Sequence, residues 1–138
     1  MSARDIFHNL VRLALQKDGW TITHDPLSID LADGQLQIDL GAERLIAAQK
    51  QDERIAVEIK SFVAPSAISE FHTALGQCLN YRVALKLKEP ERVLYLAVPL
   101  ATYEDFFSRQ LPQMSIHEYQ LKLLVFDPEN EVIVQWID

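Results

Sequence analysis

Two oppositely charged side chains, Glu58 and Lys60, stand two residues apart in a largely apolar segment, residues 55–61. Residues two apart in a β-strand point to the same side of a sheet, so the carboxylate and the ammonium would emerge next to each other. Asp39 lies at the end of an earlier β-like segment, and its carboxylate converges on Glu58 if the two segments lie close in one sheet. Metal-assisted hydrolysis of a phosphodiester requires residues of these types.

The chemistry that this set predicts is a hard-oxygen metal site. The carboxylates of Asp39 and Glu58, with the backbone carbonyl of Ile59, suit Mg²⁺ or Mn²⁺. Such an ion polarises a phosphate and activates a bound water, and Lys60 would position that water or stabilise developing negative charge. The alternative is an ordinary ion pair between Glu58 and Lys60 on a solvated strand face.

The segments that must position these residues alternate between helical and β-like patterns. A long helix between two strands, residues 54–61 and 92–100, implies a crossover and hence a parallel pair. The expected fold is a mixed sheet with helices on its faces, in a single domain over residues 1–138. Helices are predicted over 3–18 with Ser2 as N-cap, 66–87, 102–110 and after Pro112; β-like segments are predicted over 20–24, 27–31, 36–40, 44–50, 54–61, 92–100, 121–126 and 132–137, with 51–53 as a hairpin loop.

Composition limits the classes of protein to which the chain can belong. Its 138 residues, 49% of them hydrophobic, suit one globular domain. The single cysteine, Cys78, excludes an intramolecular disulfide and is expected to be buried. No apolar run approaches the roughly 20 residues of a membrane span, which predicts a cytoplasmic protein. The net charge of −7 opposes unaided binding to nucleic acid unless bound metal or a basic partner reverses the local charge.

The placement of Asp39 and residues 58–60, between one helix and a second, longer helix, resembles the PD-(D/E)xK nuclease superfamily. Residues 77–81, Gln-Cys-Leu-Asn-Tyr, are similar to the Gln-x-x-x-Tyr motif of the subset akin to the RecB nuclease domain. Gln77 and Tyr81 share one helix face, since they are four residues apart. The resemblance implies a restriction-endonuclease-like, three-layer α/β/α fold with a mixed central sheet, a Mg²⁺ or Mn²⁺ cofactor, and a cleft shaped by Gln77 and Tyr81.

The chain departs from the superfamily pattern at several positions. Ile38 stands where the motif has proline, and the separation from Asp39 to Glu58 is longer than a tight hairpin needs. Glu43 begins the segment expected to pair most directly with the Glu58 strand, so it is an alternative or additional metal ligand. Many members carry an acid on the first helix, where this chain offers Asp5 and His8. Asp5 is otherwise a helix N-terminal residue favoured by the dipole, and His8 is otherwise structural.

Longer stretches closely resemble the XisH family, the fdxN element excision controlling factors of cyanobacteria; they cover residues 5–8, 17–27, 38–43, 56–62, 124–128 and 135–136. The resemblance implies a role in programmed DNA rearrangement. It also implies three partners, namely DNA, a site-specific recombinase and a small companion protein, XisI. A homo-oligomer stays open.

Three functions follow as hypotheses. The first is a metal-dependent nuclease in which Asp39, Glu58 and Lys60 carry the chemistry. The second is a non-catalytic factor that keeps the nuclease fold and recruits the recombinase or the companion protein, which the acidic charge balance favours. The third is an interaction module in which Glu58 and Lys60 form only a structural ion pair. Metal affinity separates the first hypothesis from the others.

Overall fold

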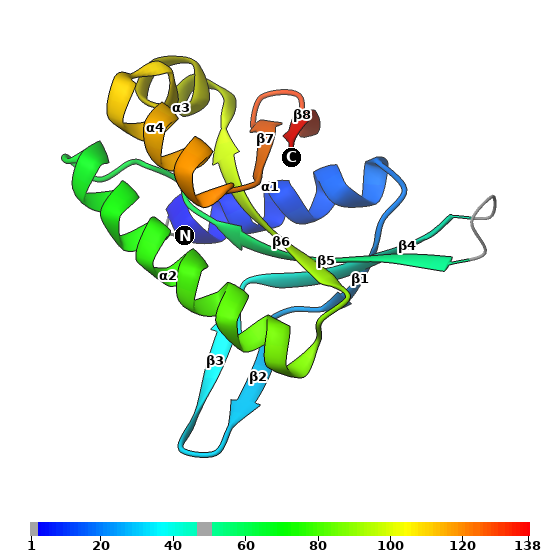
Figure 1. Cartoon of the computed structure of the whole chain (residues 1–138). Helices are drawn as coiled ribbons and strands as arrows, with labels where there is room; N and C mark the ends of the chain where they lie inside the picture. The colour runs from blue at the N-terminus through cyan, green and yellow to red at the C-terminus, as the bar shows by residue number, and fades with distance from the viewer. Residues whose placement is uncertain (1–2, 47–50) are drawn as a thin grey trace.

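The structure, a computed structural model, describes residues 3–46 and 51–138 (Figure 1). Five strands follow the first helix in succession, and one short 3-10 turn follows the third helix. In chain order the elements are α1 (Ala3–Lys17), β1 (Thr21–His24), β2 (Leu27–Leu31), β3 (Gly34–Ile38), β4 (Leu40–Ile46), β5 (Gln51–Ile59), α2 (Ala67–Lys88), β6 (Arg92–Pro99), α3 (Leu100–Asp105), η1 (Phe106–Ser108), α4 (Gln110–Tyr119), β7 (Leu123–Asp127) and β8 (Val132–Ile137).

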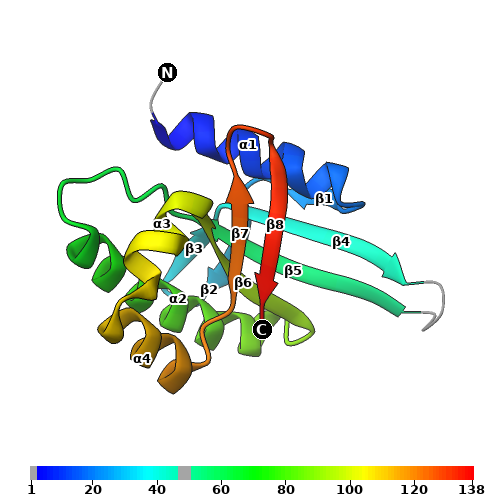
Figure 2. The ribbon, with the colours of Figure 1, turned by 90° about the horizontal axis from the view of Figure 1, so that it is seen from above.

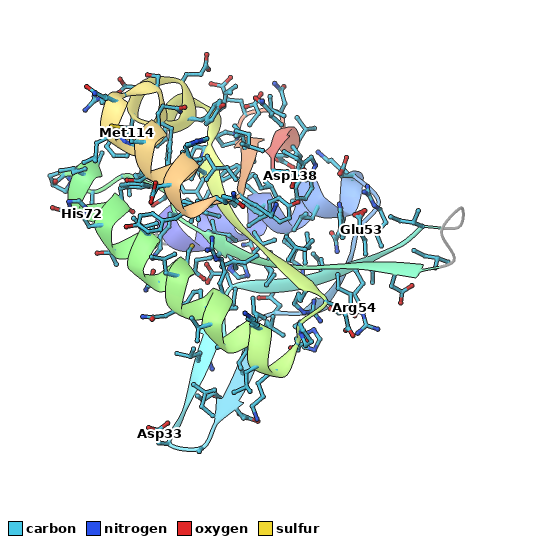
Figure 3. The ribbon with its side chains drawn as sticks, viewed as in Figure 1. Asp33, Glu53, Arg54, His72, Met114 and Asp138 are labelled. Carbon is cyan, nitrogen blue, oxygen red and sulfur yellow. The ribbon has the colours of Figure 1, made fainter. Side chains whose placement is uncertain are left out.

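The central sheet has six strands in the order β1-β4-β5-β6-β7-β8. Strands β5, β6 and β7 are parallel to one another, and the pairs β1–β4, β4–β5 and β7–β8 are antiparallel, so the sheet is mixed. The α2 crossover between β5 and β6 makes their parallel pairing possible. Strands β2 and β3 form a separate two-stranded sheet. This hairpin projects past α2, with Asp33 at its tip (Figures 1 and 3).

Helices cover both faces of the sheet, because successive strand residues supply two different cores. On β5, Ile55, Val57 and Ile59 belong to the core beneath α1, and Ala56 belongs to the core beneath α2. Figure 2 shows α1 on one side of the sheet and α2 with α4 on the other. The side that carries Glu58 and Lys60 is therefore the α2 side.

The boundary of α2 follows from its flanking residues. Ser66 is extended and its hydroxyl accepts a hydrogen bond from the Ser69 amide at 3.3 Å, as expected of an N-cap. Phe71, Ala74, Cys78 and Tyr81 recur at helical spacing and are buried against the sheet. The prediction that Cys78 is a buried free thiol is confirmed.

Most predicted elements are present, and the differences lie in the first half of the sheet. Residues 36–40 are not one strand: β3 ends at Ile38, Asp39 follows, and β4 begins at Leu40. The strand predicted over 44–50 therefore starts earlier than expected, and residues 47–50 lie outside the described part of the chain. Residues 51–53 continue β5 and are not a loop, since Asp52 and Glu53 pair with β4. The Ser2 N-cap also lies outside the described residues.

The two helices predicted in the carboxyl-terminal half of the chain begin slightly earlier than expected. The segment predicted over 102–110 is α3 followed by η1, and the helix predicted after Pro112 begins at Gln110. Among the described residues, no helix is long and apolar enough to cross a membrane.

Candidate functional site

The register between β4 and β5 brings the two acidic residues together. Leu40 pairs with Val57, so Asp39 and Glu58 stand opposite each other at the end of the two strands. The Ile59 amide donates to Oδ2 of Asp39 at 2.8 Å, and the Asp39 amide donates to Oε1 of Glu58 at 3.2 Å. The Glu58 carboxylate thus accepts from the amide of Asp39 itself, and the Asp39 carboxylate accepts from the amide of the residue that follows Glu58. This reciprocal pair fixes both side chains, although they are 19 residues apart in the sequence.

Glu58 is buried, with 6% of its surface exposed, although it carries an ionisable group on a sheet face. Burial first, and then the negative charge of Asp39, raise the pKa of Glu58 to about 8. The nearby Lys60 ammonium and the Asp39 amide act in the opposite direction but do not cancel these effects. Two carboxyl groups in one low-dielectric site resist joint ionisation, so this site attracts a proton or a cation.

Lys60, the third residue of the predicted set, follows directly after the end of β5. Its Nζ lies 3.8 Å from Oε2 of Glu58, and its side chain is 20% exposed. Its backbone amide donates to the Ala97 carbonyl at 3.0 Å, which extends the β5–β6 pairing beyond the end of β5. The predicted alternative of a solvated ion pair does not describe this arrangement, because the partner carboxylate is buried.

These three residues line a cleft of about 810 Å³ that runs between the sheet and α2. Gln77 and Tyr81 share one face of α2, as expected from their spacing of four, and both line the cleft. Oε1 of Gln77 is buried and has no hydrogen-bond donor among the described residues. Asp25, Asp39, Glu58 and Glu70 supply four carboxyl groups to the lining, and Lys60 supplies one ammonium.

Glu70 is a cleft residue that the sequence analysis missed. Its Oε1 accepts a hydrogen bond from the Phe62 amide at 3.2 Å, and its Oε2 is buried with no donor among the described residues. Phe62 adopts a left-handed backbone with φ of 56°, which is uncommon for a bulky residue. Glu70 therefore supports the turn that follows Lys60. The available signal was its position seven residues before Gln77, which places both on one face of α2.

The opposite end of the lining comes from α1 and the turn after β1. His8 lines the cleft, and its Nε2 lies 2.7 Å from Oδ1 of Asp25. Arg12, one turn further along α1, pairs with Oδ2 of the same carboxylate. Asp25 thus contacts two residues of α1, a role that its sequence context does not indicate.

One predicted ligand, Glu43, is not brought to the cleft. Glu43 faces Arg54 across β4 and β5 and forms ion pairs with Arg54 at 3.5 Å and with Arg92 at 3.8 Å. Glu43 does not line the cleft. The side chain of Asp5 lies outside the described residues.

The donor set fits a hard divalent ion. Among the described residues, no group of three or more His, Cys, Asp or Glu side chains is close enough to enclose a metal. An all-protein cage is therefore not what this part of the chain offers. Mg²⁺ is usually bound by one or two carboxylates, with waters and substrate oxygens completing its shell. Asp39 and Glu58 supply two such groups side by side, and the Ile59 carbonyl is the backbone oxygen expected from the sequence.

Comparisons with known proteins cover almost the whole chain. Two crystal structures match with a TM-score of 0.89 each. An XisH family protein from Nostoc punctiforme PCC 73102 is 55% identical, over 97% of this chain and 100% of that chain. An fdxN element excision controlling factor protein from Anabaena variabilis is 56% identical, over 98% and 100%. No match was found among curated proteins. A family model described as XisH protein matches residues 1–134; with the two structures, it shows that this chain belongs to the XisH family.

Proposed function

We propose that the cleft is a metal-dependent phosphodiesterase site of the PD-(D/E)xK, restriction-endonuclease-like type, and that it acts on DNA during element excision. The observation that carries the proposal is the reciprocal hydrogen bonding of Asp39 and Glu58, with Lys60 at 3.8 Å from the second carboxylate. The name of the Anabaena variabilis relative, an excision controlling factor, supplies the biological context.

Each residue has a chemical task in this proposal. Asp39 and Glu58 would hold Mg²⁺ or Mn²⁺, with the Ile59 carbonyl as a further oxygen. When bound, the ion supplies Lewis-acid polarisation of a phosphate and a more acidic water. Lys60 supplies a positive charge beside the reacting phosphate, where it stabilises negative charge that develops on the oxygens. Gln77 and Tyr81 shape the α2 wall against which substrate would lie.

The charge of the cleft explains why a cation must accompany a nucleic acid. Four carboxyl groups and one ammonium line the cleft, and the chain carries a net charge of −7. Phosphate binding depends on local positive charge. We therefore propose that DNA binding requires the divalent ion, or a partner subunit such as an XisI-like companion protein or a site-specific recombinase, or a second copy of the chain.

The same charge balance favours a second candidate, a non-catalytic factor that recruits a recombinase or companion protein through the nuclease-like fold. An acidic surface suits a basic protein partner better than it suits DNA. In that case the Asp39–Glu58 pair would remain as structure without turnover.

A cleavage assay separates the two candidates. Purified protein is incubated with duplex, single-stranded and branched DNA, with Mg²⁺, Mn²⁺ or EDTA, with and without a companion protein. We expect divalent-dependent cleavage, and a loss of more than about 100-fold in Asp39→Asn and Glu58→Gln, because the ion contributes several kcal/mol at the transition state.

The matched control is Glu43→Gln, an acid on β4 that lies outside the cleft. It should cleave like the wild type. If Glu43→Gln is inactive and Asp39→Asn is active, Glu43 and not Asp39 is the second ligand. If no substrate is cleaved under any condition, the recruitment function replaces the nuclease.

A further inference from the structure

The cleft wall formed by α1 carries a hydrogen-bonded pair, His8 and Asp25, to which the proposed metal site assigns no task. Both residues line the cleft, and the side chains are 23% and 26% exposed. Their separation of 2.7 Å between Nε2 and Oδ1 is that of a charge-assisted hydrogen bond. The two residues come from different elements, 17 positions apart, so the contact is tertiary and not a by-product of helix geometry.

The partner fixes which ring nitrogen of His8 carries hydrogen. An ionised carboxylate only accepts hydrogen bonds, so Nε2–H is the donor to Asp25. In the neutral imidazole the remaining nitrogen, Nδ1, then has a free lone pair and is an acceptor. Among the described residues, Nδ1 of His8 has no hydrogen-bond partner.

Arg12 completes the arrangement from the adjacent turn of α1. It pairs with Oδ2 of Asp25, so both carboxylate oxygens have a partner. The guanidinium offsets the charge of Asp25 and holds the carboxylate against α1. A histidine oriented by a carboxylate, in a cleft beside reacting groups, is the arrangement by which proteins prepare an imidazole to accept a proton.

We propose that His8 accepts a proton at Nδ1 during phosphodiester hydrolysis in this cleft, and that Asp25 is the residue that positions it. The inference rests on the proposed function. The attacking water gives one proton to Nδ1, and its oxygen forms the new bond to phosphorus. The bond from phosphorus to the leaving oxygen breaks, its electron pair stays on that oxygen, and the resulting alkoxide takes a proton from solvent. His8 becomes imidazolium, with Nε2–H still bound to Asp25.

The charged groups around His8 are consistent with this task. Asp25 stabilises the imidazolium, while the positive charge of Arg12 moderates it. The other charged groups of the same cleft are Asp39, Glu58, Lys60 and Glu70. Three of these four residues carry carboxyl groups, and Lys60 carries an ammonium group.

The first test needs no activity. Long-range ¹H–¹⁵N NMR spectra of the imidazole rings report which nitrogen carries hydrogen. At a pH where His8 is neutral, the wild type should show the Nε2–H form at His8, and Asp25→Asn should show a mixture, because the amide both donates and accepts. His72, which is exposed on α2 (Figure 3), serves as the reference ring. A hydrogen on Nδ1 of wild-type His8 would overturn the inference.

The second test is kinetic, on the DNA substrate that the wild type cleaves. We expect His8→Asn to lower kcat by about 10²- to 10⁴-fold with KM nearly unchanged, which is the range for positioned acid–base groups. Asp25→Asn should lower kcat by about 10-fold or more, since the ring remains but its tautomer is no longer fixed. Asp25→Glu, which keeps the charge, should recover part of the loss. His72→Asn is the matched control and should cleave like the wild type.

Failure of the inference and failure of the proposed function are told apart by Asp39→Asn. If Asp39→Asn is inactive and His8→Asn keeps its kcat, the metal site stands and the His8–Asp25 pair has no catalytic task. If the wild type cleaves nothing under any condition, both ideas fall together. If the fall in kcat of His8→Asn comes with a fall in its unfolding midpoint, loss of stability explains the result and the inference fails. It stands if Asp25→Glu restores kcat while its unfolding midpoint is unchanged.

Discussion

The burial of Glu58 beside Asp39 makes the stability of the protein depend on pH in a direction opposite to that of most carboxyl groups. The pKa of Glu58 rises from 4.5 to about 8 in the folded state, mainly through burial. Between these values the folded protein keeps a proton that the unfolded chain has lost. The free energy of unfolding therefore falls as the pH rises from about 4.5 to about 8.

The size of this effect follows from the two pKa values. A difference from 4.5 to about 8 corresponds to about 5 kcal/mol, at about 1.4 kcal/mol for each pH unit. Since whole domains are stable by only about 5–15 kcal/mol, the effect is large enough for an equilibrium measurement. Glu58→Gln cannot ionise, and its amide oxygen can still accept the hydrogen bond from the Asp39 amide that Oε1 accepts in the wild type.

The assay is urea unfolding of the wild type and Glu58→Gln, without divalent ions, at intervals from pH 5 to pH 9. We expect the two proteins to be similar at pH 5 and the variant to be more stable at pH 9, by up to about 5 kcal/mol. Comparison of the two proteins cancels the titration of the other acidic groups. Glu129→Gln, an exposed acid in the β7–β8 turn, is the matched control and should follow the wild type. Parallel curves for wild type and Glu58→Gln would refute the reasoning.

Three further predictions test the site and its support. Mn²⁺ at about 100 times its Kd should raise the free energy of unfolding of the wild type by about 3 kcal/mol at pH 8, measured by urea denaturation. Asp39→Asn should show little of this gain, and an equal gain in that variant would show that the metal binds elsewhere. Burial raises the pKa of Cys78 to about 12, so iodoacetamide at pH 8 should leave the folded protein unlabelled and modify it in urea; rapid labelling of the native protein would contradict this burial. Phe107 is fully buried in ring contacts with Phe62 and Phe71. Phe107→Ala should lower the free energy of unfolding by about 3–5 kcal/mol, measured by urea denaturation. Leu111→Ala, at a half-exposed position, should lower it little.

Local patterns in the sequence predicted the elements well where one physical signal dominates. The alternation of residues 55–60 placed Glu58 and Lys60 on one strand face, and the apolar segment after α2 predicted the parallel β5–β6 pair. Ser66 and the helical spacing that follows predicted α2 almost to the residue. In each case the relevant interaction is local, or is imposed by a single crossover.

Pairing between distant strands could not be read in the same way. Nothing local shows that β2 and β3 leave the main sheet or that β4 begins directly after Asp39, because both depend on which strands meet in space. The alternative ligand Glu43 arose from the same uncertainty, since a shift of four residues in the β4–β5 register would place Glu43 opposite Glu58. Asp25 and Glu70 were missed because each contacts a backbone or side chain on another element.

The β4–β5 hairpin runs outward from the site for seven residue pairs, from Leu40–Val57 to Ile46–Gln51. Its length sets the sequence distance between Asp39 and Glu58, but the geometry of the two carboxylates is determined only at its base. A pair of residues could be removed from both strands near Ile46 and Gln51 without changing the contact between the acids. The spacing between these acids is therefore free to drift among related chains, and a motif search that fixes it would overlook relatives whose cleft is the same.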